Sequence, residues 1–160
     1  MREIAGNEYV DIAIWIVILI FSSIIHEIAH AWVALRCGDN TAKEQGRITF
    51  NPVAHICPIN SILIPLVLYF SAGFIIGGAK PVPINPGRLK NPDRDMALAS
   101  AAGPISNLLI VLFITIILCA SKFITKEQYL NNAYENFFII RVLWGVIILN
   151  LILAFFNLLP

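Results

Sequence analysis

Two histidines and a glutamate, His26, Glu27 and His30, stand in the stretch "IIHEIAHAW" (residues 24–32). On a helix, residues four positions apart lie on one face, so both imidazoles can reach one metal ion. A His-Glu-x-x-His helix is typical of zinc sites, and its glutamate can act as general base toward a water molecule on the metal. The spacing therefore predicts a zinc hydrolase centre, with His26 and His30 as metal ligands and Glu27 as the catalytic base.

The surroundings of these three residues are almost free of charge. An ionisable group inside an apolar membrane segment costs several kcal/mol, so such groups are rare and usually functional. The alternative is a helix whose polar residues are merely satisfied by their neighbours, and the apolar surroundings disfavour it.

The composition indicates a membrane protein. Of 160 residues, 58% are hydrophobic and only 13% are charged, whereas a soluble domain carries about 25% charged residues. The net charge of +1 provides no basic field of the kind that binds nucleic acid. Three widely spaced cysteines do not make a disulfide framework. We expect a multi-pass protein of the cell membrane, with the lipid bilayer as its surroundings and no nucleic-acid partner.

Four apolar segments, at about 10–35, 56–79, 96–120 and 137–160, each have roughly the 20 residues that a membrane-spanning helix needs. The second segment contains several helix-weakening residues: Pro58, Pro65, Gly73, Gly77 and Gly78. If it dips into the membrane and returns, seven lysines and arginines lie on one side and four on the other, which fits the positive-inside bias better than an even division. The predicted fold is all-α, with three core transmembrane helices and a re-entrant segment in a single domain, residues 1–160.

Two polar connections carry short extended runs, "GRITF" (46–50) and "PVPI" (81–84). We expect them to form a small hairpin-like sheet near the histidines. An exposed edge of that sheet could pair with an unwound substrate strand.

Five pieces of the sequence, taken in order, resemble one family. They are "HEIAHAWVALRCGD", "GRITFNPVAHI", "GGAKPVPINP", "ASAAGPISNLL" and "AFFNLLP". Together they resemble the site-2 proteases, intramembrane zinc metalloproteases, and most closely the compact prokaryotic branch without a PDZ domain. The resemblance implies cleavage of transmembrane protein substrates, zinc bound by His26 and His30, and Glu27 as base. It also implies a third ligand, an aspartate in an "LDG"-type motif after "NLLP". The chain stops at Pro160 without that aspartate, so we expect a truncated sequence.

Three further polar residues are candidate contacts of the substrate or of the oxyanion. Asn107 shares a helical face with Ser100 and Gly103, and this face serves either close helix packing or the binding of substrate and oxyanion. His55 is a loop residue, a substrate contact or a substitute metal ligand. Asn157 lies in the family's motif and is expected near the metal, whereas for Asn150 we favour a hydrogen bond between helices.

A second function remains open, that of a catalytically inactive relative or a metal-handling membrane protein. A transporter usually has intramembrane carboxylates on several helices, whereas Glu27 is the only acidic residue well inside a segment. An inactive relative agrees with the same residues. None of these patterns indicates an oligomeric state.

Overall fold

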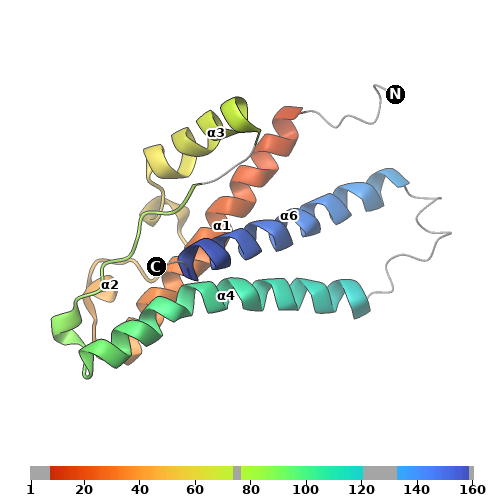
Figure 1. The fold of residues 1–160 in the computed structure, drawn as a ribbon. Helices are drawn as coiled ribbons and strands as arrows, with labels where there is room; N and C mark the ends of the chain where they lie inside the picture. Colours follow the sequence, from red (N-terminus) through yellow and green to blue (C-terminus); the bar gives the residue numbers. More distant parts are fainter. Residues whose placement is uncertain (1–7, 74–76, 121–132, 159–160) are drawn as a thin grey trace.

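Three long helices form the body of the protein. The computed structural model describes residues 8–73, 77–120 and 133–158. Helices α1 (Glu8–Arg36), α4 (Pro92–Ala120) and α6 (Ala133–Leu158) all contact one another, and the end of α6 reaches the region where α1 crosses α4 (Figure 1). Each contains a stretch long and apolar enough to cross a membrane. The predicted all-α membrane protein with three long core helices is confirmed at this level.

The three helices meet in a small apolar core with one polar link. Ile18 and Leu19 of α1 are buried against Leu149 of α6. Beside them the Asn150 amide donates a hydrogen bond to the Ser22 hydroxyl at 2.9 Å, which confirms the predicted bond between helices. Many large apolar side chains on the outer faces stay exposed, as expected for helices that lipid surrounds.

The second apolar segment is short and turns back on itself. A π-helical turn, η2 (Pro58–Leu63), leads into α3 (Ile64–Ala72), which ends at Gly73 in the left-handed conformation. As a helix Pro58–Ala72 would extend only about 22 Å, less than the roughly 30 Å of a hydrocarbon core. The Gly78 N–H donates to the Asn60 carbonyl at 3.1 Å, so the chain returns to the place where the segment began.

The loops are built from short helical turns: α2 (Thr41–Glu44), η1 (Pro52–Ala54) and η3 (Pro86–Arg88). Asn51 and Asn85 start η1 and η3, because each side-chain oxygen accepts an N–H two residues further on. The proline that follows each asparagine sits in the first turn, where its missing N–H costs nothing. Two of the three Asn-Pro dipeptides thus begin the turns that shape the loops.

The predicted hairpin-like sheet is wrong. Neither 46–50 nor 81–84 forms a strand, although the structure describes both runs. Pro81 and Pro83 have no N–H to donate to a neighbouring strand. The nearby carbonyls of Ala54, Lys80 and Pro81 instead accept hydrogen bonds from the Arg47 guanidinium. The two runs lie close together, but a side chain joins them and no backbone ladder does.

Candidate active site

The two histidines of α1 face each other. The Nε2 atoms of His26 and His30 are 2.9 Å apart. Their other ring nitrogens both bind α4, where His30 Nδ1 lies 2.7 Å from the Ala99 carbonyl oxygen and His26 Nδ1 lies 3.2 Å from Asn107 Oδ1. Because these oxygens accept hydrogen bonds, each Nδ1 carries the proton and each Nε2 presents a bare lone pair. Helix α4 thereby fixes the tautomer and the orientation of both rings.

This arrangement fits a zinc ion. Two ligands of a tetrahedral zinc ion, each about 2.0–2.1 Å from the metal, lie about 3.3 Å apart. The observed pair needs to open by only a few tenths of an ångström. Without a cation the two lone pairs would repel each other, whereas a metal between them satisfies both. The hydrogen bonds to Nδ1 are the outer contacts that metal-binding histidines usually have.

Gly103 of α4 makes room for this pair. A methyl group at that position would overlap the Nε2 atoms of both His26 and His30. The sequence shows Gly103 in a small-residue run on the same face as Asn107, but its contact with the two ring nitrogens is visible only in the fold. The space that a side chain would fill here is the space beside the candidate metal position.

The side chain of Glu27, unlike those of the two histidines, is bound by a loop. Its carboxylate oxygen Oε2 accepts the backbone N–H of Val82 at 2.7 Å. Val82 lies in the extended run 80–85, between Pro81 and Pro83, and sequence reasoning missed its role. A usable signal was present, since Val82 and Ile84 are the only residues of "PVPI" with an N–H.

The three candidate contacts of the substrate or the oxyanion lie in different surroundings. Asn107 is fully buried; its Oδ1 faces His26, while its Nδ2 has no partner among the described residues. Asn157 lies near enough to interact with the His26 imidazole. His55 is buried in the loop and its Nε2–H donates to the Thr49 carbonyl at 2.9 Å. The structure thus brings Asn107 and Asn157 to the histidine pair, whereas His55 serves the loop.

No third metal ligand joins the pair within the described residues. Among them, no three His, Cys, Asp or Glu side chains cluster in a way that could hold an ion. His55 is therefore not a substitute ligand in this arrangement. The site as described consists of two imidazoles, one carboxylate and one unpaired amide group.

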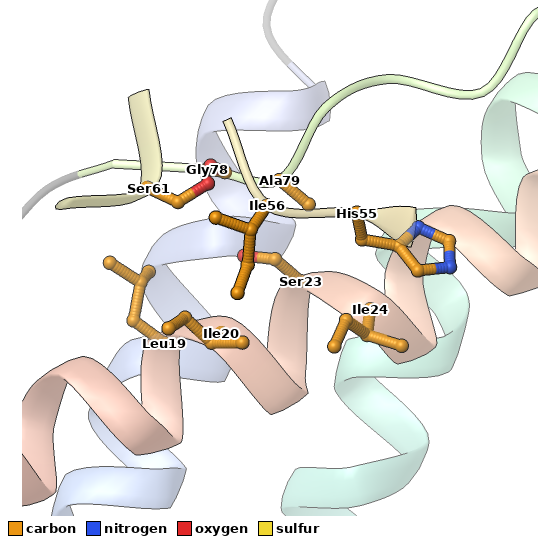
Figure 2. Close-up of a pocket in the computed structure, with 9 residues that line it drawn as sticks. All are labelled: Leu19, Ile20, Ser23, Ile24, His55, Ile56, Ser61, Gly78 and Ala79. Carbon is orange, nitrogen blue, oxygen red and sulfur yellow. Dashed lines mark hydrogen bonds between the residues drawn. The ribbon is translucent and has the colours of Figure 1, made fainter. Parts of the chain in front are cut away.

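An apolar pocket lies between α1 and the loops (Figure 2). Ser23 lines it one helical turn before Glu27, and the Ser23 hydroxyl has no hydrogen-bond partner among the described residues. The pocket is lined by Leu19, Ile20, Ser23 and Ile24 of α1, and by His55, Ile56, Ser61, Gly78 and Ala79 of the loops.

The fold and the site together define a class, a helical membrane protein with a His-Glu-x-x-His motif on one of its long helices. No protein-family model matches the chain, and no solved structure matches it.

Two relatives agree with that class. Over 147 residues, 91% of this chain, the sequence is 41% identical to "Putative zinc metalloprotease YwhC" of Bacillus subtilis. Over 96 residues, 59% of this chain, it is 28% identical to "Putative zinc metalloprotease Rip2" of Mycolicibacterium smegmatis. The matched regions cover 62% of the first relative and 36% of the second, so the chain spans at most about three fifths of their length.

Proposed function

We propose that this chain carries the catalytic centre of an intramembrane zinc metalloendopeptidase of the site-2 protease type, which hydrolyses peptide bonds of transmembrane proteins. One observation carries the proposal: the Nε2 atoms of His26 and His30 lie 2.9 Å apart, with both Nδ1 atoms bound to α4. Glu27, next to His26, adds a carboxylate at the same site. The names of the two relatives support the same chemistry.

Each residue has a defined task in this proposal. His26 and His30 would hold zinc, which would supply a Lewis acid for the water and the substrate carbonyl group. Glu27 takes the proton from the attacking water and passes it to the leaving amide nitrogen. The unpaired Asn107 Nδ2 donates to a substrate carbonyl oxygen and stabilises the oxyanion. Asn157 binds the substrate backbone beside the metal.

The third zinc ligand belongs to the proposal as well. Catalytic zinc sites have three protein ligands and an open position. We assign the third to an aspartate that the family resemblance predicts after residue 160. A site with that carboxylate would bind zinc far more tightly than the two imidazoles alone.

The second apolar segment is assigned a re-entrant course in the membrane. Its two ends are hydrogen-bonded to each other through Asn60 and Gly78, so the loops before and after it lie together. Single cysteines at positions 45 and 85 should then react with a membrane-impermeant reagent from the same side. Labelling from opposite sides would contradict the re-entrant course.

Glu27→Gln in the full-length protein tests the catalytic part. It should lower kcat about 10²–10⁴-fold and leave the zinc content unchanged, because the amide cannot accept the proton. Cleavage would be measured with fluorescent casein in detergent and with a single-span reporter protein in membranes, and zinc by metal analysis. Glu44→Gln is the matched control, since Glu44 is exposed and pairs with Arg88 on the surface.

Two results would count against the assignment. Unchanged cleavage by Glu27→Gln would exclude Glu27 as the base. A full-length protein that binds zinc and cleaves neither substrate would instead support the inactive relative.

A further inference from the structure

The extended run 80–85, here called the strap, crosses beside Glu27 without forming a sheet. Three of its amides have partners in the surrounding loop and helix residues. Lys80 N–H donates to the His55 carbonyl, Val82 N–H to Glu27, and Asn85 N–H to Asp39, each at 2.7 Å. Two of its six residues are prolines, which donate nothing. The place of the strap therefore depends on a few individual contacts.

The Arg47 guanidinium binds backbone carbonyl groups of the strap. Its Nη2 donates to the carbonyl oxygens of Lys80 and Pro81, and its Nη1 donates to the Ala54 carbonyl. The residue is only 7% exposed. Within the part of the chain that the structure describes, no carboxylate forms an ion pair with it. A buried cation is costly, and here backbone carbonyls of the two loops accept hydrogen bonds from its Nη1 and Nη2 atoms.

One peptide group links Arg47 to Glu27. The Pro81 carbonyl and the Val82 N–H belong to the same planar peptide unit and point in opposite directions. Arg47 Nη2 binds the carbonyl at 3.2 Å, and Glu27 Oε2 binds the N–H at 2.7 Å. A cation on the carbonyl also polarises the unit and makes its N–H a better donor. The guanidinium thus acts on the carboxylate through a rigid connection.

We propose that Arg47 is a positioning residue that sets the orientation of Glu27 through the Pro81–Val82 peptide. This inference rests on the proposed function, in which Glu27 is the base. With Oε2 occupied by the Val82 N–H, the other oxygen, Oε1, is left to accept the proton of the attacking water. If the peptide tilts, the carboxylate turns with it, and a displacement of about 1 Å at a catalytic group can cost about 100-fold in rate.

Two matched pairs of variants in the full-length protein test the proposal. Arg47→Lys keeps the charge but loses the fork that binds several carbonyls, and Arg88→Lys makes the same change at an exposed ion pair. Val82→Pro removes the N–H in a run that is already extended, and Val82→Ala keeps it. We expect Arg47→Lys and Val82→Pro to lower kcat per bound zinc about 10–100-fold on fluorescent casein. Both should keep KM within about 2-fold of the wild type. Arg88→Lys should match the wild type in kcat and KM, and Val82→Ala should keep more of the wild-type kcat than Val82→Pro does.

Hydrogen exchange supplies a readout that does not depend on catalysis. In Arg47→Lys the Val82 amide should exchange about 10-fold faster, while amides of α4 exchange as in the wild type. Unchanged kcat per zinc, or unchanged exchange at Val82, would overturn the role of Arg47. If Arg47→Lys does not fold, Val82→Pro decides, and wild-type kcat in that variant overturns the proposal. If the wild type cleaves nothing, the proposed function fails, and the exchange measurement still tests the link from Arg47 to Val82.

Discussion

The two histidines and the glutamate lie within five residues of α1, yet two very different regions of the protein bind their side chains. His26 and His30 are oriented by the long helix α4, where the Asn107 side-chain oxygen and the Ala99 carbonyl oxygen accept hydrogen bonds from the two rings. Glu27 is oriented by a backbone N–H of an irregular, proline-containing run. A helix–helix contact is a rigid support, whereas a loop keeps its place only through individual bonds. Damage to the first region should therefore remove zinc, and damage to the second should spare zinc and change stability or rate.

The largest effect should follow Gly103→Ala, which tests the helical half. Alanine is the better helix former by about 1 kcal/mol, but its methyl group overlaps both Nε2 atoms. To make room, the rings must leave their partners on α4. We expect zinc affinity to fall about 100-fold or more in the full-length protein, measured by competition with a chelating dye. Gly78→Ala is the control, because a methyl group there meets open space; equal zinc affinity in both variants would contradict the close contact.

Asn107→Ala should weaken the same half less. It removes the oxygen that faces His26 Nδ1 and leaves both rings in place. Loss of such an outer contact lowers metal affinity about 10–100-fold. Asn150→Ala is the control, since it breaks the bond to Ser22 between α6 and α1 and should lower only the melting temperature. Zinc affinity in Asn107→Ala equal to that in Asn150→Ala would show that α4 does not orient His26.

Asp39→Asn probes the other half at the far end of the strap. Burial raises the pKa of the Asp39 carboxyl, but hydrogen bonds from Thr41 and Asn85 and the charge of Arg88 outweigh it, so the pKa lies below its usual value. Its stabilising effect is therefore complete above pH about 4 and is lost as the pH falls through the lowered pKa. At neutral pH the variant should melt about 2–4 °C lower with zinc retained. Below pH about 4 the difference in melting temperature should shrink, and a constant difference would contradict the assignment.

The smallest effect concerns His55 in the neighbouring loop. Burial and the charge of Arg47 lower the pKa of His55, although its bond to the Thr49 carbonyl opposes them. The folded state therefore favours the neutral ring. The contribution of His55 to folding stability is fully present above pH about 6.5 and falls as the pH drops toward the lowered pKa. The wild type should lose about 1–2 °C in melting temperature between pH 7 and 5.5. His55→Gln should lose less over that range; an identical slope would exclude His55 as the cause.

The sequence by itself determined the long helices and the chemical identity of the site. Lipid leaves an apolar chain few choices other than helices, and helical periodicity places His26 and His30 on one face with Glu27 beside them. The same periodicity places Gly103 and Asn107 together on another helix. These are local properties, which is why they could be read from spacing alone.

Only the tertiary structure decided how the loops meet the site. The predicted sheet between "GRITF" and "PVPI" does not form: Pro81 and Pro83 have no N–H for a ladder, and the Arg47 side chain binds the Pro81 carbonyl. The Val82 N–H donates a hydrogen bond to Glu27, 55 residues earlier in the chain. Such partners depend on which groups are brought together when segments distant in sequence pack, and no period or propensity encodes that. The helices bring the two histidines and the glutamate together, and the fold of the loops orients the Glu27 carboxylate.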